Sequence, residues 1–396
     1  MKTDKVQSSS EGSFTSNGAP RVFTVEHLNT LIRNLRDQGY AVIGPVVQDA
    51  AIVYDEISSS EDLPIGWIDT QSNASYRLTK RAAKTLFNFT VGPQSWKKYL
   101  HKPSVRILEA EKNGNEFAVN DAQPPAKKQA FLGVRACELH AIAIQDRVLL
   151  GGPYVDPIYA ELRTNTLIVA VNCEKAGGTC FCASMGTGPR AEHGYDLALT
   201  EIRESDHHYF LIETGSALGA TVLAGLPAEV ASESDIQAAN RVIATATHQM
   251  GRKVDMSEMK EILYRNTENP RWQDIASRCM SCANCTLVCP TCFCTTIEDT
   301  TDLRGTRAER WRKWDSCFTM EFSYIHGGSI RTSPGTRYRQ WLTHKFGSWG
   351  DQFGSAGCVG CGRCITWCPV GIDVTEELKA IRDSELVEAG SIKSKE

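Results

Sequence analysis

Two copies of one cysteine motif lie in the last third of this chain of 396 residues, at 279–290 and 358–369. In each copy three cysteines stand two residues apart, and a fourth follows three residues later, directly before a proline. This spacing is typical of proteins that hold two 4Fe–4S clusters. Three thiolates on one tight loop can converge on three corners of a cube, whereas the fourth points elsewhere. The repeated motif therefore predicts a fold built around two clusters.

The fourth cysteine of each motif is expected to bind the cluster of the other motif, as in two-cluster ferredoxins. The two predicted ligand sets are Cys279, Cys282, Cys285 and Cys368 for one cluster, and Cys358, Cys361, Cys364 and Cys289 for the other. Crossed ligation would hold the two cubes close enough to exchange single electrons. Zinc also favours Cys-x2-Cys pairs, but it closes a site with four ligands and usually has a longer loop between the pairs. Eight cysteines in two matching runs fit cubes better.

The amino-acid composition indicates the class of protein and the kinds of partner that can be expected. With 41% hydrophobic and 23% charged residues, the chain reads as an ordinary soluble protein of two or three domains. A formal net charge of −4 gives no pull toward nucleic acid or an anionic membrane, so neither is expected as a partner. The apolar runs are too short to insert directly into a membrane. The first twenty residues lack the pattern of a signal peptide, which favours the cytoplasm, where reduced thiols are free to bind metal.

The fold class expected is an α/β, or α+β, N-terminal domain followed by a mainly helical dicluster domain. Residues 1–21 are poor in apolar side chains and read as a flexible tail. Residues 22–254 alternate β-branched runs, at 40–47 and 166–173, with stretches of helical period, which predicts the α/β domain. The run at 130–150 reads as a strand that continues into a helix with an apolar face.

Residues 255–396 are predicted to form the helical dicluster domain. The two motifs are separated by 68 residues, which is too long for a minimal ferredoxin. Within this insert RAERWRKW, at 307–314, and RYRQWLTHKF, at 337–346, favour helices. A basic cluster in and beside the first of these runs could dock an acidic partner or could be a solvated helix face: Arg304, Arg307, Arg310, Arg312 and Lys313.

A second cysteine group in the N-terminal domain predicts another metal site: Cys137, Cys173, Cys180 and Cys182. Cys137 and Cys173 each follow a predicted buried strand, and α/β proteins place ligands outside the carboxyl ends of strands. A helix that opened at Cys137 would lower its thiol pKa and favour the thiolate. A third 4Fe–4S cluster is the preferred interpretation. Structural zinc and plain buried or redox-reactive thiols are the alternatives.

The remaining cysteines, Cys292, Cys294 and Cys317, lack the fourth thiolate that a cube normally has. A histidine such as His326 could complete a site with them. The interpretation preferred from the sequence is that they pack around the clusters and tune them through contacts and S–H hydrogen bonds.

Five segments carry a family resemblance in their order along the chain: GVRACELHAI, VNCEKAGGTCFCASMGTGP, RCMSCANCTLVCPTCFCTT, WDSCF and GCVGCGRCITWCPVGID. Over roughly residues 60–380 the chain resembles the iron–sulfur β subunit of cytoplasmic sulfhydrogenases ([NiFe] hydrogenase/sulfur reductases), and it is closely similar to the A subunit of anaerobic sulfite reductase. The resemblance implies an electron-relay subunit. Its partners would be a flavoprotein subunit that binds NAD(P) and a subunit with the hydrogenase or reductase centre.

No catalytic residue is assigned, because the sequence shows neither a dinucleotide or phosphate-binding glycine loop nor a nucleophile or zinc-protease motif. The leading hypothesis is an electron-transfer subunit that carries two 4Fe–4S clusters and a third in the N-terminal domain. The alternative is a self-contained iron–sulfur reductase that acts on a small substrate at the N-terminal cysteine site.

Overall fold

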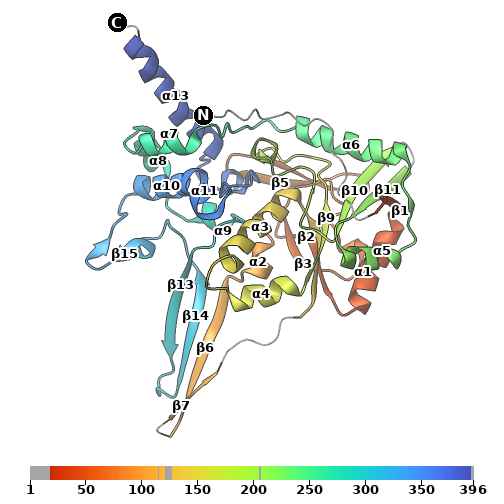
Figure 1. Ribbon diagram of the computed structural model, residues 1–396, viewed down its shortest axis with the longest axis horizontal. Coiled ribbons are helices and arrows are strands. Elements are labelled where there is room, and N and C mark those ends of the chain that lie inside the picture. Colours follow the sequence, from red (N-terminus) through yellow and green to blue (C-terminus); the bar gives the residue numbers. More distant parts are fainter. Residues whose placement is uncertain (1–17, 115, 121–126, 205–206, 394–396) are drawn as a thin grey trace, which may run out of the picture.

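The computed structural model describes residues 18–114, 116–120, 127–204 and 207–393 (Figure 1). Of the predicted tail, residues 1–17 lie outside this range, whereas Arg21 already belongs to the first strand. The chain forms a mixed sheet with its helices, a helical part that contains the two cysteine motifs, and a β-arm that projects away from both.

The main sheet has eight strands among the described residues, in the order β12-β1-β11-β10-β9-β8-β2-β3. In that order the strands are β12 (Glu229–Val230), β1 (Arg21–Thr24), β11 (His207–Thr214), β10 (Leu197–Glu204), β9 (Thr166–Val171), β8 (Gln129–Val134), β2 (Ala41–Gln48) and β3 (Ala51–Glu56). The pairs β2–β8, β8–β9 and β9–β10 are parallel, and the other pairs are antiparallel. Both β8 and β9 are buried at every residue, as expected for apolar parallel strands.

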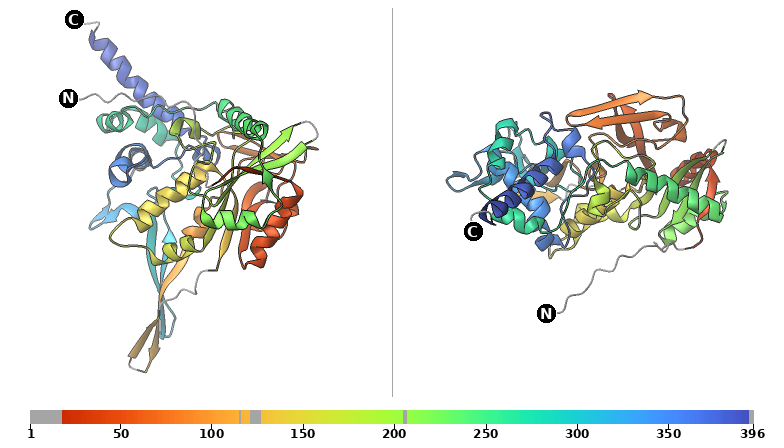
Figure 2. Two further views of the ribbon diagram at one scale, coloured as in Figure 1. Left: turned by 45° about the vertical axis from the view of Figure 1, so that its right-hand side comes forward. Right: turned by 90° about the horizontal axis from the view of Figure 1, so that it is seen from above.

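Helices cover both faces of this sheet. The helices α1 (Glu26–Asp37), α3 (Ala136–Leu150), α4 (Pro157–Thr164) and α5 (Ala217–Ala224) share the main hydrophobic core with the sheet, and α6 (Glu233–His248) packs against Ile202 and Leu211. Figure 2 shows the hairpin β4 (Trp67–Ser72) and β5 (Ser75–Lys80) standing off the sheet. The face of α1 that meets the sheet carries Leu28, Leu31, Ile32 and Leu35, spaced as an amphipathic helix requires.

The helix α3 joins the two halves of the molecule. The predicted strand-to-helix segment at 130–150 is present, because β8 ends at Val134 and α3 begins at Ala136. Leu139 and Ile142 pack into the core of the sheet, whereas Ala141 and Ile144 pack against Trp349 and Val359 of the helical part. A helix that is apolar on several sides belongs in an interior, and α3 lies between the two cores.

The helical part surrounds the two cysteine motifs. Its helices are α7 (Met259–Arg265), α8 (Arg271–Arg278), α9 (Asn284–Leu287), α10 (Pro334–Thr343), the π-helix η4 (His344–Ser348), α11 (Trp349–Phe353), α12 (Arg363–Thr366) and α13 (Val374–Lys393). The run predicted as a helix at 337–346 lies in α10 and η4. Leu263, Ile275, Leu342 and Ile381 are fully buried in its core. In the described ranges, no helix is both long and apolar enough to cross a membrane.

The prediction of a helix at RAERWRKW is wrong, because this run is the strand β14 (Arg307–Trp314). It pairs on one side with β13 (Thr295–Thr301) and on the other with β6 (Ser104–Asn113). The strand β6 in turn pairs with β7 (Glu116–Asn120). These four strands form the arm in Figure 1. Side chains of high helix propensity are overridden here by pairing with distant strands.

The arm also changes the interpretation of the basic cluster. Its arginines and lysine lie on a strand and in the preceding turn rather than on a helix face, and four of them pair with carboxylates. Arg310 lies 2.7 Å from Asp299, and Arg307, Arg312 and Lys313 pair with Glu109, Asp156 and Glu298. Three of these pairs join neighbouring strands of the arm, and the pair of Arg312 with Asp156 joins the arm to the start of α4. Much of the cluster's charge is therefore balanced within the chain.

Candidate metal sites

The two cysteine motifs fold in the same way. In the first, Ser281 and Ala283 have φ of 53° and 65° and lead into α9. In the second, Gly360 and Gly362 have φ of 63° and 73° and lead into α12. These left-handed residues turn the chain tightly between successive cysteines. Each loop therefore brings three thiols to one side, as the spacing predicted.

Backbone amides point at the sulfurs of both loops. The N–H of Ser281 donates to Cys279 Sγ, and the N–H of Gly360 donates to Cys358 Sγ, both at 3.4 Å. The N–H of Ile372 donates to Cys368 Sγ at the same distance. Hydrogen bonds to ligating sulfur stabilise its negative charge and raise the potential of an iron–sulfur cluster. These loops thus have the donors that a thiolate-bound cluster uses.

The structure brings the first predicted ligand set together. All four thiols line one small cavity of about 30 Å³, whose apolar walls include Phe318, Tyr338 and Trp341: Cys279, Cys282, Cys285 and Cys368. Burial raises the pKa of Cys285, and the neighbouring thiols of Cys279 and Cys368 raise it further. Four sulfurs around one apolar space fit a cubane cluster.

The second predicted set is gathered in the same manner. Burial raises the pKa of Cys364, and so do the nearby thiols of Cys358, Cys361 and Cys289. Cys289 comes from the first motif and Cys368 from the second, so each loop supplies one sulfur to the group of the other. The residues present therefore fit the crossed arrangement.

The four N-terminal cysteines also lie together. Cys137 is in the first turn of α3, Cys173 follows β9, and Cys182 begins the short helix η2 (Cys182–Met185). Burial raises the pKa of Cys182, and the thiols of Cys180 and Cys173 raise it further. For Cys137, burial is again the first cause, followed by Cys182. The carboxyl ends of two neighbouring strands thus meet at one group of thiols, as the strand positions predicted.

The expected effect of the helix on Cys137 is corrected by the structure. Its position in the first turn of α3 was expected to lower the thiol pKa, but burial dominates and raises it. Burial likewise raises the pKa of Cys180 to about 12. Without metal these thiols hold their protons at neutral pH, so metal binding must release protons.

The N-terminal cysteines pack directly against the second motif. The N–H of Phe181 donates to the carbonyl of Gly360 at 2.8 Å, and the thiol of Cys180 lies 3.8 Å from the carbonyl oxygen of Cys361. Thr179 Oγ1 and Thr366 Oγ1 are 2.7 Å apart. The sites therefore follow one another in space, from the N-terminal thiols to the second set and then to the first.

A buried ion pair fastens this contact. Arg363, in the second motif, pairs with Glu138, in the first turn of α3, and their side chains are 7% and 2% exposed. Glu138 Oε2 also accepts from the N–H of Trp96 at 3.2 Å, and Arg363 Nε donates to the carbonyl of Gly92 at 3.2 Å. Arg363 adjoins Cys364, and Glu138 adjoins Cys137. The ion pair therefore holds the two adjoining predicted ligands, Cys364 and Cys137, in fixed positions relative to each other.

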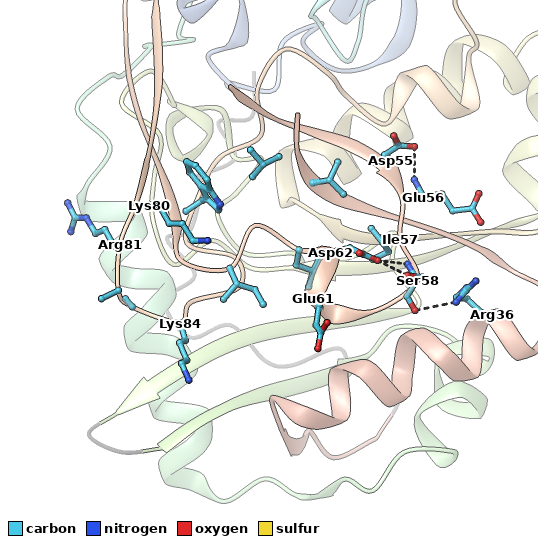
Figure 3. A pocket seen from close by; sticks show the side chains of 17 residues that line it. Arg36, Asp55, Glu56, Ile57, Ser58, Glu61, Asp62, Lys80, Arg81 and Lys84 are labelled. Atoms are coloured by element: carbon cyan, nitrogen blue, oxygen red, sulfur yellow. Dashed lines mark hydrogen bonds between the residues drawn. The ribbon is translucent and has the colours of Figure 1, made fainter. Parts of the chain in front are cut away.

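A separate cavity of about 900 Å³ contains no cysteine among its lining residues (Figure 3). Lys80, Arg81 and Lys84 line it together with Glu61 and with Asp62, which is engaged in hydrogen bonds with Ser58. Its charges are mixed, and it lies apart from the thiol groups. We assign it no part in metal binding.

Within the described ranges, no group of three or more His, Cys, Asp or Glu side chains is arranged around a single metal ion. A cubane differs from a single ion because each thiolate binds a different iron. The three cysteines left unassigned by the sequence, Cys292, Cys294 and Cys317, line a further cavity beside His344. His326, suggested as their fourth ligand, is instead exposed in the turn between β15 (Tyr324–Ile325) and β16 (Gly328–Ser329).

Comparison with known proteins agrees with this geometry. Residues 278–372 match the family model of the 4Fe-4S dicluster domain. The chain is also similar to the protein named sulfhydrogenase 2 subunit beta from Pyrococcus furiosus, with 27% identity over 362 residues, which cover 90% of this chain and 97% of the relative. The match extends well beyond the dicluster domain, so it includes the N-terminal sheet and its cysteines.

Proposed function

Because this chain is an iron–sulfur protein with a 4Fe–4S dicluster domain and is similar to a sulfhydrogenase β subunit, we propose that it relays single electrons within a multisubunit oxidoreductase. The observation that carries this proposal is the row of three thiol groups, in which Cys361 of the middle group contacts Cys180 and Cys364 of the middle group lines the same cavity as the first group. When bound, 4Fe–4S clusters supply one-electron oxidation and reduction. The ligand sets are the two crossed sets and, for a third cluster, the four N-terminal cysteines.

The protein's own residues would hold these groups and adjust them. Apolar walls such as Phe318 and Trp341 shield one side of the first set, of which Cys282 is exposed. Arg363 and Lys345 place buried positive charge beside the second set. Burial raises the pKa of Cys361 and of Cys358. Arg363 acts in the opposite direction on the pKa of Cys361, and Lys345 does so on the pKa of Cys358. Positive charge favours the more negative, reduced state, so the second site is expected to have the higher potential for its type.

The partners in this proposal are a flavoprotein subunit that binds NAD(P) and a catalytic subunit of the hydrogenase or sulfur or sulfite reductase kind. The relative's name, sulfhydrogenase 2 subunit beta, says that the relative is one subunit of a larger complex, which supports the presence of partner subunits. The chain itself would have no catalytic centre. The terminal acceptor would then be chosen by the partner rather than by this chain.

The third cluster can be tested by metal content. Replacing Cys180 with alanine should lower the iron content of anaerobically purified protein by about four per chain, together with the matching sulfide, because a cube holds four irons. Ser184→Ala is the matched control, since Ser184 lies in the same segment and its hydroxyl bonds to the carbonyl of Phe181 and the N–H of Val254 rather than to a cysteine. Equal iron in the two variants, or the loss of one zinc from Cys180→Ala, would place no cluster at the N-terminal thiols.

The relay can be separated from a self-contained reductase by turnover. The purified chain, chemically reduced, is expected to deliver a fixed number of electrons and then stop when given sulfite or polysulfide. Continuous turnover should begin only when a flavoprotein and a catalytic subunit are added. Sustained substrate reduction by the chain alone, abolished in Cys180→Ala, would instead establish the reductase.

A further inference from the structure

Three cysteines that neither motif uses meet at the root of the β-arm. Cys294 directly precedes β13 and Cys317 follows β14, and the N–H of Asp315 donates to the carbonyl of Cys294 at 2.9 Å. This bond closes the base of the hairpin, and the thiols of Cys294 and Cys317 line one cavity there. Cys292 lines the same cavity. The arm therefore ends in a compact group of thiols.

An enclosed space adjoins these thiols. A cavity of about 420 Å³ is lined by Cys292, Cys294 and Cys317, and His344 and Gln340 also reach it. His344 Nε2 lies 2.9 Å from Gln352 Oε1, and its ring lies 4.7 Å from that of Trp349. There is room at the thiols for a polyatomic group, and an imidazole lies within the same walls.

Two buried lysines face this region. Lys97 is 5% exposed and Lys345 is 2% exposed. Lys97 Nζ donates to the carbonyl of Cys292 at 3.1 Å and lies 3.9 Å from the ring centre of Trp314. Lys345 Nζ donates to Thr291 Oγ1 at 2.8 Å and to the carbonyl of Gly357 at 3.0 Å. A buried ammonium group destabilises the folded state unless negative charge lies near it.

Thiols of the second set and unassigned thiols act on both lysines. Negative charge at Cys289, Cys292 and Cys358 favours the ammonium form of Lys345. Lys97 Nζ bonds to the carbonyl of Cys292, and negative charge at Cys292, Cys289 and Cys294 favours its ammonium form. Negative charge at Cys292 would therefore help to balance both ammonium groups. Thiolates that bind metal supply such charge.

We propose that Cys292, Cys294 and Cys317 bind a further iron–sulfur cluster, whose remaining position faces the cavity beside His344. A cluster distributes its thiolates over several irons, which fits three thiols placed around one cavity. Zinc would need its ligands around one ion, and no such group occurs in the described part of the chain. This site lies outside both crossed sets and outside the N-terminal four.

The test is native mass spectrometry of the full chain, purified without oxygen, which counts iron and sulfide directly. Cys294→Ser and Cys317→Ser should each lose the same iron, about two or four per chain according to the cluster type. Ser316→Ala is the matched control, because Ser316 is equally close to the arm but its hydroxyl bonds to Thr286 Oγ1 and the N–H of Phe318 rather than to a cysteine. It should keep the iron content of the unaltered protein.

Two results would overturn the proposal. One is the same iron content in the unaltered protein and in both cysteine variants; the other is loss of a zinc ion without iron. If the variants do not fold, as judged by circular dichroism, the iron content of the unaltered protein still decides. It must exceed the iron that the two crossed sets and the N-terminal cysteines together account for, the latter being the iron lost in Cys180→Ala. Because Cys180→Ala removes iron from a different site, failure of this proposal would leave the relay proposal intact.

Discussion

Replacing Gly362 with alanine is expected to separate the N-terminal cysteines from the second motif. Gly362 has a φ of 73°, and an added Cβ would lie 2.2 Å from the carbonyl oxygen of Thr179. A left-handed alanine and an overpacked backbone contact together cost about 2–5 kcal/mol. The shift would act on the segment that carries Cys180 and Cys182. We therefore expect a lower apparent melting temperature and a loss of iron from both adjoining sites.

The first motif provides a matched control for this experiment. Ala283 occupies the place equivalent to Gly362 and already has a φ of 65°. Ala283→Gly relieves the left-handed strain, but it increases the conformational entropy of the unfolded chain and removes a buried methyl group. The net change in the free energy of unfolding should therefore stay within about 1 kcal/mol. Thermal unfolding and iron content, both without oxygen, measure the difference. If Gly362→Ala kept the stability and the iron of the control, the close contact between motif and Thr179 would be refuted.

Replacing Arg363 with methionine is expected to destabilise the protein by about 3–5 kcal/mol, because it leaves the carboxylate of Glu138 buried without its partner. Glu138 is 2% exposed, so water cannot compensate for the loss. Removing this positive charge should also lower the potential of the cluster at the second set, since Cys364 adjoins the arginine. Denaturant unfolding and a redox titration followed by electron paramagnetic resonance would measure the two effects.

A double variant distinguishes the ion pair from simple packing. With Glu138→Leu added to Arg363→Met, no buried charge remains, and much of the lost stability should return. The lower potential should persist, since the positive charge is still absent. A double variant less stable than Arg363→Met alone would mean that packing, rather than charge pairing, fastens the two motifs.

The sequence by itself determined the features that depend on short spacing. The Cys-x2-Cys loops, the two crossed ligand sets as a prediction, and the passage from β8 into α3 all rest on residues close together in the chain. The helical run in α10 could be predicted for the same reason. Local spacing sets which side chains can face one another, so such features need little knowledge of the rest of the fold.

Only the tertiary structure decided the features that join distant segments. RAERWRKW has helix-forming residues but becomes β14, because β6 and β13 supply hydrogen bonds on both of its sides. The approach of Thr179 to Gly362, the pairing of Glu138 with Arg363 and the burial of Lys97 beside Cys292 likewise involve residues far apart in the chain. No local pattern records such contacts, since they arise only when the sheet, the arm and the cysteine loops pack together.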